Sequence, residues 1–381
     1  MFKIILVMIK RRYDNLGELI RKGKVIVLYG PRRVGKTTLL TKFVKKSKLR
    51  CKFVSGDNLE IRNVLSSQSS QIIGGYLQNY DLLALDEAQR IPEVGLGLKI
   101  LVDHFPQIFV IITGSASLDL SYKVGEPLVG RKFTYRLYPL WIGELGNGKN
   151  DYELSESKTE RLIFGSYPEV VCAQTKTERI QILEENVSSY LFKEIIEVEK
   201  ISNTKLLLDL LKLIAFQVGQ EVSLTELGAS LGIDRKTVQR YLNLFEQSFI
   251  LYNLRGFSRN LRKEVTKKSK YYFWDNGVRN AVIKNFNDLG TRNDVGALWE
   301  NYLVTERLKK QEYDRIYANN YFWRTWEGQE IDWVEERGGK LFGFEFKWQG
   351  KKVKVPSKWQ ATYAEASFKV IDQDNFLDFV K

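Results

Sequence analysis

The sequence GPRRVGKTT (residues 30–38) follows an apolar run, KVIVLYG (24–30), and begins a segment with helical spacing, KTTLLTKFVKK (36–46). It fits the pattern G-x-x-x-x-G-K-S/T in its expected context, with a strand before the loop and a helix after it. Glycines in such a loop let backbone N–H groups close around phosphate oxygens, and the helix N-terminus adds its positive dipole end. A chance Gly-Lys turn is the alternative, and the flanking elements disfavour it. The sequence therefore predicts a phosphate-binding loop.

The loop predicts ATP and Mg²⁺ as cofactors. We expect Lys36 to reach the β- and γ-phosphates and the Thr37 hydroxyl to bind Mg²⁺. The residues expected to contact the nucleotide are Gly30, Pro31, Arg32, Arg33, Val34, Gly35, Lys36, Thr37 and Thr38.

An acidic pair follows in LLALDEAQR (82–90). The apolar strand delivers Asp86 to the carboxyl edge of a sheet, where nucleotides bind in open α/β folds. Asp86 is expected in the Mg²⁺ shell, and Glu87 is expected to polarise the water that attacks the γ-phosphate. A strand that merely ends in acidic residues is the alternative, which is less favoured beside a phosphate loop.

The apolar runs in this part of the chain predict a parallel sheet. They alternate with helical patterns and are KVIVLYG (24–30), KFVSGD (52–57), LLALDE (82–87) and IFVIITGS (108–115). Near-continuous apolar content is typical of strands that are covered on both faces. The expected fold class is therefore α/β, a P-loop NTPase with a parallel sheet.

Two further features are weaker candidates for this site. The run 108–115 leads into Thr113, Ser115 and Ser117, and a hydroxyl there could lie between the attacking water and the γ-phosphate; ordinary turn residues are the alternative. Arg131, in LVGRKF, could stabilise transition-state charge, and a surface arginine is its alternative.

Composition limits the class of protein. The chain has 381 residues, 44% hydrophobic content and a formal net charge of +13, so we expect two or three globular domains and a polyanionic partner, nucleic acid above all. A basic surface without such a partner is the alternative. One histidine (His104) cannot support a histidine-rich metal site, and two distant cysteines (Cys51 and Cys172) indicate a reducing compartment.

The N-terminal sequence MFKIILVMIKRR has an apolar run that is too short for a signal peptide, and its basic residues follow the run. No segment approaches the roughly 20 apolar residues of a membrane span. We therefore expect a cytoplasmic protein without a membrane partner.

Residues 222–245 predict a helix-turn-helix. Ser223 and Glu226 form a capping box, Gly232 supplies the turn, and Asp234 caps the second helix. The apolar face is expected to contain Leu227, Leu231, Ile233, Val238, Leu242 and Phe245. The second helix then presents residue types that suit reading the major groove of DNA, namely Arg235, Lys236, Gln239, Arg240 and Asn243.

A basic segment (255–270) follows this motif and contains one acid, Glu264. Its basic residues are Arg255, Arg259, Arg262, Lys263, Lys267, Lys268 and Lys270. They predict a wing that contacts DNA phosphates, chiefly through Lys267, Lys268 and Lys270. A packing or protein-contact module is the alternative.

Two strands near the C-terminus carry acids and a lysine. In LFGFEFKW (341–348) the aromatic residues alternate onto one face, which places Glu345 and Lys347 on the other; EIDWV (330–334) places Asp332 in the same way. With Glu300 upstream, these groups could hold Mg²⁺ and position a water for phosphodiester hydrolysis. A solvated hairpin face is an equal alternative.

The chain resembles a known family, the prokaryotic and archaeal AAA-type ATPases with a DUF4143-like C-terminal region. The similarity lies in GPRRVGKTT (30–38), LALDEAQR (83–90), TGSAS (113–117), LVGR (128–131), GSYPEVV (165–171), FWDNGVR (273–279), GALWEN (296–301), EIDW (330–333) and EFKW (345–348). The resemblance implies a winged helix followed by a nuclease-like fold of the PD-D/ExK type. It makes Asp332, Glu345 and Lys347 the nuclease triplet with Glu300 upstream, and it suggests Arg131 at the nucleotide or intersubunit site.

We therefore expect a P-loop ATPase core (1–140), a helical lid (141–220), a winged helix-turn-helix (221–285) and a nuclease-like domain (286–381). The favoured function is an ATPase associated with nucleic acid, chiefly DNA, whose nucleotide state controls metal-dependent cleavage or remodelling. The alternative is a nucleotide-gated binding module with an inactive nuclease-like domain. A homo-oligomer or a protein partner fits either function.

Overall fold

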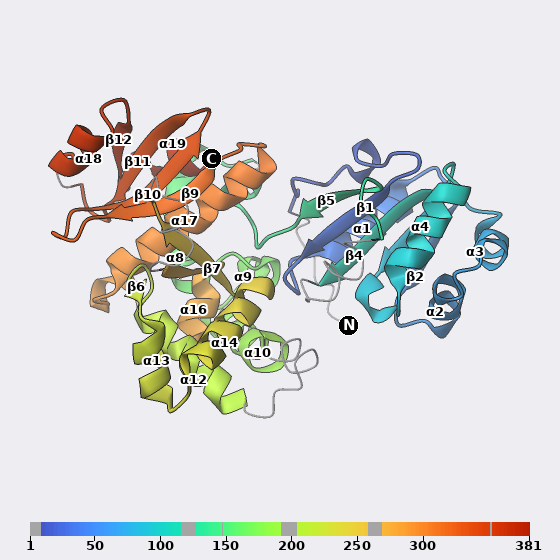
Figure 1. The fold of residues 1–381 in the computed structure, drawn as a ribbon, viewed down its shortest axis with the longest axis horizontal. Helices are drawn as coiled ribbons and strands as arrows, with labels where there is room; N and C mark the ends of the chain where they lie inside the picture. The colour runs from blue at the N-terminus through green and yellow to red at the C-terminus, as the bar shows by residue number, and fades with distance from the viewer. Residues whose placement is uncertain (1–8, 116–126, 147, 192–203, 258–268, 351–352) are drawn as a thin grey trace.

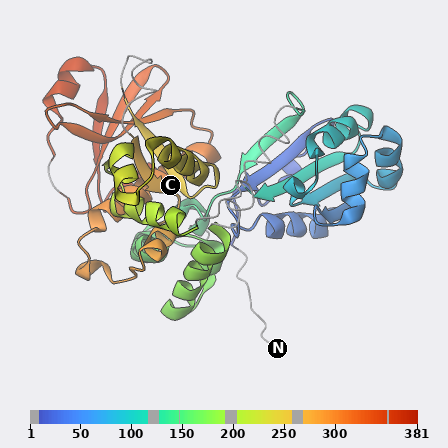
Figure 2. The same cartoon turned by 60° about the horizontal axis from the view of Figure 1, so that its bottom comes forward.

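The computed structural model describes residues 9–115, 127–146, 148–191, 204–257, 269–350 and 353–381. Its strands form two separate sheets, and the N-terminal sheet lies apart from the C-terminal one in both views (Figures 1 and 2). Helices α10 (Lys176–Glu185) and α12 (Thr204–Phe216) lie below the C-terminal sheet in Figure 1.

The N-terminal sheet has five strands in the order β2-β3-β4-β1-β5. They are β1 (Val25–Gly30), β2 (Cys51–Ser55), β3 (Leu82–Asp86), β4 (Phe109–Ser115) and β5 (Lys132–Arg136). All neighbouring pairs are parallel, so the carboxyl ends of the strands share one edge. Strand β4 lies between β1 and β3, and both β3 and β4 are almost wholly buried. The predicted α/β fold with a parallel sheet is confirmed.

Helices cover this sheet because its central strands β1, β3 and β4 are apolar on both faces. They are α1 (Lys36–Lys46), α2 (Leu59–Ser66), α3 (Ser70–Leu77) and α4 (Val94–His104), with the short turns η1 (Leu16–Glu18) and η2 (Ala88–Arg90). On one face Leu83, Leu85 and Val110 pack with the apolar residues of α2 to α4. On the other face Ile26 and Leu28 belong to a core that continues into the rest of the molecule.

The middle segment is helical. It contains α6 (Ile142–Leu145), α7 (Asp151–Glu156), α8 (Lys158–Phe164), α9 (Pro168–Cys172), α10 (Lys176–Glu185), the π-helical turn η3 (Asn186–Leu191) and α12 (Thr204–Phe216). Helix α12 buries Leu207, Leu210, Leu211 and Ile214, the apolar stripe expected from its helical spacing.

The second sheet has seven strands in the order β12-β11-β10-β9-β7-β8-β6. They are β6 (Glu221–Val222), β7 (Leu251–Gly256), β8 (Ser269–Phe273), β9 (Asn319–Arg324), β10 (Glu330–Arg337), β11 (Lys340–Phe346) and β12 (Ser367–Ile371). Its helices are α13 (Leu224–Leu231), α14 (Arg235–Gln247), α16 (Asn276–Val282), α17 (Val295–Tyr313), α18 (Ser357–Thr362) and α19 (Phe376–Val380), with the turn η4 (Leu289–Thr291).

Strands β7 and β9 are hydrogen-bonded neighbours in this sheet. The sheet is therefore continuous across residue 285, where we expect one domain to end and the next to begin. This continuity places β8, from the helix-turn-helix segment, in the same sheet as the β10–β11 hairpin.

Helix α17 links the second sheet to the N-terminal half. Its last residue, Tyr313, accepts hydrogen bonds at its carbonyl from the Arg12 side chain, at 3.2 and 3.0 Å. The Tyr313 hydroxyl accepts a hydrogen bond from the backbone N–H of Tyr138, just after β5, at 3.2 Å. Further along the segment that follows β5, the backbone N–H of Ile142 donates a hydrogen bond to Glu306 of α17 at 2.7 Å.

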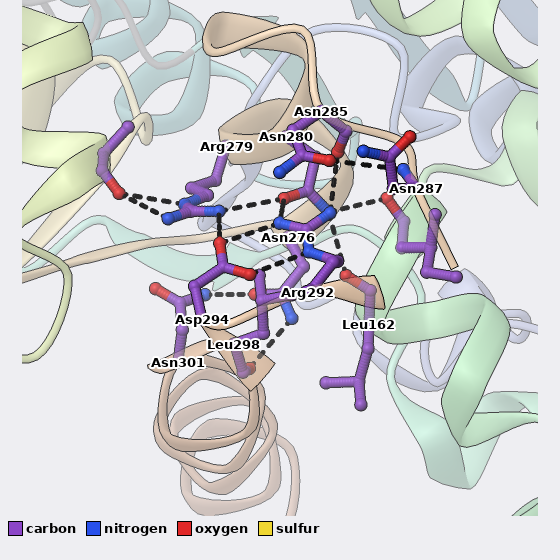
Figure 3. A network of polar contacts seen from close by, with 12 residues as sticks. Leu162, Asn276, Arg279, Asn280, Asn285, Asn287, Arg292, Asp294, Leu298 and Asn301 are labelled. Carbon is purple, nitrogen blue, oxygen red and sulfur yellow. Dashed lines mark hydrogen bonds and ion pairs between the residues drawn. The ribbon is translucent and has the colours of Figure 1, made fainter. Parts of the chain in front are cut away.

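A buried polar network fixes α16 between its neighbours (Figure 3). Arg279 donates to the carbonyl of Ala215 at the end of α12 and pairs with Asp294 at 2.5 Å. Asn280 donates to the carbonyls of Leu162 and Ile163 in α8, at 3.0 and 2.8 Å. This network explains why the FWDNGVR motif is polar although it is buried.

The GSYPEVV motif packs against the start of α16. Asp275 accepts a hydrogen bond from the backbone N–H of Ser166 at 2.6 Å. Gly165 has φ +71°, and a Cβ there would lie 1.9 Å from the Asp275 carboxylate. Likewise, a Cβ on Gly277 would lie 2.1 Å from the carbonyl oxygen of Phe164. These two motifs therefore hold the fold together and belong to no catalytic site described below.

Candidate nucleotide site and acidic cluster

The phosphate loop joins β1 to α1 with backbone angles that favour glycine. Gly30 has φ +154° and Gly35 has φ +96°. A Cβ on Gly30 would lie 2.0 Å from the carbonyl oxygen of Leu137, so a side chain does not fit there. Gly35 is the N-cap of α1, and Thr37 and Thr38 on its first turn are exposed. The remaining loop residues, Pro31, Arg32, Arg33 and Val34, connect the two glycines.

Lys36 lies inside this loop. Its ammonium donates to the carbonyls of Gly30 and Pro31, at 2.8 and 2.7 Å, and its side chain is buried. The cation is therefore held at the place where the loop would surround a phosphate. Nearby, Arg33 forms an ion pair with Glu169 of α9 at 3.2 Å, which ties the loop to the helical segment.

Asp86 lies at the carboxyl end of β3 and faces the loop. One carboxylate oxygen accepts a hydrogen bond from the Thr37 hydroxyl at 2.8 Å, and the other accepts one from Thr113 on β4. A hydroxyl and a carboxylate in contact at the end of the phosphate loop are the oxygen donors that Mg²⁺ takes in such sites. Thr37 and Asp86 therefore fit the predicted ion, and the weaker candidate Thr113 orients the carboxylate.

Glu87 follows Asp86 in a left-handed backbone conformation, φ +52°. The Gln89 side chain amide donates to the Glu87 carboxylate and to the Ser115 hydroxyl, the latter at 3.1 Å. Ser115 pairs in register with Gly30, so this chain of contacts brings Glu87 beside the start of the phosphate loop. The role of Gln89 was not predicted from the sequence, because there it is one polar residue of a turn. Ser117 lies outside the described residues.

Arg11 is a second residue that the sequence did not reveal. It is buried and donates to the carbonyls of Val34, in the phosphate loop, and Tyr138, the latter at 2.7 Å. It also forms an ion pair with Glu144 at 3.0 Å. Arg11 therefore connects the phosphate loop to the segment that leads into the second half. No local pattern marks it, because its partners are distant in sequence.

Arg131 does not lie at the phosphate loop, which corrects the expectation of a nucleotide-site arginine within one chain. Lys132 pairs with Val25, at the start of β1, so Arg131 lies at the opposite end of the parallel strands. The loop begins about five residues further on, roughly 16 Å along the strand. Arg131 instead forms an ion pair with Asp103 at 2.6 Å.

In the second half, the predicted acidic residues converge from three elements. Helix α17 supplies Glu300, β10 supplies Asp332 and β11 supplies Glu345. Asp332 accepts a hydrogen bond from the backbone N–H of Phe346 at 2.8 Å, and Lys347 pairs with Glu345 at 2.7 Å. Burial and the neighbouring carboxylates of Glu300 and Glu345 raise the pKa of Asp332 well above its ordinary value.

Lys270 also lies in this group, which corrects its predicted place on a DNA-binding wing. Its side chain is only 2% exposed and cannot contact a phosphate backbone. The ammonium pairs with Glu330 and lies 3.7 Å from Glu300 Oε1. Burial lowers the pKa of Lys270, but attraction to Glu300, Asp332 and Glu330 outweighs it and raises the pKa above its ordinary value.

The predicted metal set of Asp332, Glu345 and Glu300 does not fit a divalent ion as it stands. Within the described part of the chain, no three His, Cys, Asp or Glu side chains form a group that could hold a metal ion. The buried ammonium of Lys270 lies 3.7 Å from the Glu300 carboxylate and attracts that of Asp332. The expected metal site in the C-terminal half is corrected accordingly.

Helix α14 keeps its predicted polar face in solvent. Asp234 caps the helix by accepting from the backbone N–H groups of Lys236 and Thr237, at 2.8 and 3.0 Å. Arg235, Lys236 and Arg240 are exposed, and Gln239 is half-buried and donates to Asn243 at 2.9 Å. The opposite face buries Val238, Leu242 and Phe245. Lys267 and Lys268 lie outside the described residues.

Comparison with known proteins agrees with the N-terminal site. Residues 22–146 match the family described as AAA domain. Residues 155–289 match a domain of unknown function, DUF8612, and residues 295–373 match another, DUF4143. The five-stranded sheet and its phosphate loop therefore lie in the part of the chain that matches the AAA domain. In particular, the chain carries an AAA domain followed by a C-terminal DUF4143 domain, and the predicted family resemblance is confirmed to that extent.

Two relatives with similar sequences carry the description uncharacterized protein. A protein of Mycobacterium tuberculosis is 27% identical over 354 residues, covering 91% of this chain and 75% of its own length. A protein of Methanocaldococcus jannaschii is 25% identical over 354 residues, covering 84% of this chain and 77% of its own.

Among solved structures, the RuvB Holliday junction branch migration motor of Thermotoga maritima is 21% identical, with a TM-score of 0.30. The match covers 60% of this chain and 81% of RuvB. None of the described helices of the present chain is long and apolar enough to cross a membrane.

Proposed function

We propose that this protein hydrolyses ATP at the phosphate loop and associates with DNA through helix α14. The proposal for ATP hydrolysis rests on one observation. Thr37 contacts Asp86 at the end of the loop that surrounds Lys36. The proposal for DNA is supported by the exposed basic face of α14 and by the net charge of +13.

In the proposed reaction each residue of the nucleotide site has one role. The loop N–H groups and Lys36 bind the phosphates, and Lys36 exchanges its two carbonyl contacts for phosphate oxygens. Thr37 and Asp86 would hold Mg²⁺, which would neutralise charge on the phosphate oxygens. Glu87 orients the attacking water and accepts its proton, and Gln89 holds the Glu87 carboxylate in place.

The proposed DNA contact uses the second helix of the helix-turn-helix. Arg235 and Lys236 lie on the first turn of α14, and Arg240 lies further along the same helix. All three are exposed, and the apolar residues on the other face fix the helix against the core. The helix can therefore present cations to phosphates without rearrangement of the fold.

Metal-dependent cleavage does not enter this proposal, because Lys270 lies among the carboxylates that would hold the ion. The same observation favours the alternative role for the C-terminal half, a nuclease-like fold that binds a partner without cutting it. A cleavage assay with DNA and RNA in the presence of Mn²⁺ separates the two roles, since any cleavage lost in Asp332→Asn would contradict the binding role.

The DNA proposal predicts a change in salt dependence. Replacing Arg235, Lys236 and Arg240 together by alanine is expected to lower the slope of log K against log salt by about three, because each cation contributes about one released counterion. The measurement is a fluorescence-anisotropy titration of duplex DNA at several salt concentrations.

The matched control is the triple alanine variant of Lys45, Lys46 and Lys48, which are exposed at the end of α1 and just beyond it. This control removes the same charge at a distant place, and its slope of log K against log salt is expected to stay close to that of wild type. If the slope fell equally in both variants, net charge alone would explain the change, and α14 would not be part of the DNA interface.

A further inference from the structure

The acidic cluster, defined here as Glu300, Glu330, Asp332 and Glu345, contains a cation supplied by the protein itself. Lys270 comes from β8, between β7 and β6, and its backbone pairs with Leu254 and Glu221. Its side chain passes the ring of Phe322, with the ammonium 5.2 Å from the ring centroid. It ends at the Glu330 carboxylate and 3.7 Å from Glu300. The sheet therefore fixes where this ammonium lies.

The other polar contacts of the acidic cluster are also made within the protein. The Tyr272 hydroxyl donates to Glu300 at 2.7 Å. Asp332 accepts from the backbone at Phe346 and Glu345 accepts from Lys347. Glu345 Oε2 is the exception, a buried oxygen with no hydrogen-bond partner among the described residues.

We propose that Lys270 is the resident cation of the acidic cluster, and that the cluster binds no divalent metal ion while this lysine is in place. The cluster holds one buried carboxylate, Asp332, and three half-buried ones, and such a concentration of like charge is stabilised by a cation. The lysine supplies it permanently, whereas a metal ion would have to displace a buried ammonium from at least one ion pair. Neither the phosphate loop nor α14 contributes to this cluster, so its test is independent of the proposed ATPase.

The charge balance of the cluster also supports Lys270 as its cation. Lys270 and Lys347 neutralise two of the four carboxylates. Burial, against the attraction of Lys270, leaves the pKa of Glu300 raised above its ordinary value.

Mn²⁺ binding to the full-length, nucleotide-free protein tests the proposal. The wild-type protein is expected to show no Mn²⁺ site that depends on Asp332, so wild type and Asp332→Asn should give the same electron paramagnetic resonance titration at millimolar Mn²⁺. Submillimolar binding in wild type that disappears in Asp332→Asn would overturn the proposal. Because the phosphate loop is the same in both proteins, any Mn²⁺ bound there cancels.

A second pair of variants tests the role of the lysine. Lys270→Met keeps a side chain of similar length without its charge, and it is expected to raise Mn²⁺ affinity at least about tenfold. Lys347→Met removes one charge from the half-exposed side of the same group but leaves Lys270 in place, so it should bind Mn²⁺ no better than wild type. Equal Mn²⁺ binding in folded Lys270→Met and wild type would overturn the proposal; if Lys270→Met does not fold, the comparison of wild type with Asp332→Asn still decides it.

Discussion

Replacing Glu87 by glutamine is expected to lower ATP turnover at least about 100-fold while ATP still binds. Glutamine has nearly the same shape as glutamate but its amide cannot accept the proton of the attacking water. The phosphate contacts of the loop and the Thr37–Asp86 pair do not involve Glu87, so affinity should remain. Phosphate release in the steady state measures turnover, and calorimetry measures binding.

Glu93→Gln is the matched control for this change. Glu93 is also an acid with a left-handed backbone conformation, φ +49°, but it is exposed at the start of α4. Its replacement should leave turnover at the wild-type level. If Glu87→Gln hydrolysed ATP as fast as this control, Glu87 would not be the residue that activates the water.

The second large effect is expected on stability, from Glu335→Ala. Glu335 is fully buried and accepts hydrogen bonds from Arg307 at 2.6 and 2.9 Å, from Gln311 at 2.9 Å and from Trp333 at 3.0 Å. Its loss would leave Arg307 buried without its carboxylate partner. The expected loss in the free energy of unfolding is about 3–5 kcal/mol.

Urea denaturation followed by circular dichroism measures this change. Glu336→Ala removes the neighbouring, half-buried acid, whose contact with Asn319 is weak at 3.4 Å, and should cost less than about 1 kcal/mol. Similar losses in the two variants would show that the Arg307–Glu335 pair contributes no special stability.

The same pair predicts a pH dependence. Burial alone would raise the pKa of Glu335, but the hydrogen bonds and charge of Arg307 outweigh it and lower the pKa below its ordinary value. A folded-state pKa below the unfolded value contributes stability that is present above the unfolded pKa and is lost as the pH falls. The difference in stability between wild type and Glu335→Gln should therefore shrink on acidification from neutral pH.

The parts of the nucleotide site that were predictable are contiguous in sequence. The loop from Gly30 to Thr37 and the pair Asp86 and Glu87 each lie in one short run with strand or helix on a known side. Parallel strands place their carboxyl ends together, so local pattern was enough to predict the meeting of the two runs. Arg11 could not be predicted because its partners Val34, Tyr138 and Glu144 are distant in sequence. Gln89 contacts the nearby Glu87, but its second partner, Ser115, lies on another strand.

The acidic cluster shows where local pattern fails. Strand alternation correctly placed Asp332 and Glu345 near each other, since both belong to one hairpin. The place of Lys270 depends on β7 pairing with β9, a contact between distant segments that joins β8 to the same sheet. Without that pairing, a lysine at the end of a basic run reads as a solvent-exposed phosphate contact.

Calorimetric titration of ATP into wild type and Lys36→Ala, with Mg²⁺ present, tests whether the phosphate loop is the nucleotide site. We expect one ATP site in wild type, with affinity lowered at least about 100-fold in Lys36→Ala, because the variant loses the ammonium that the phosphate loop holds in place. Equal ATP affinity in the two proteins would contradict the assignment of residues 30–37 as the nucleotide site.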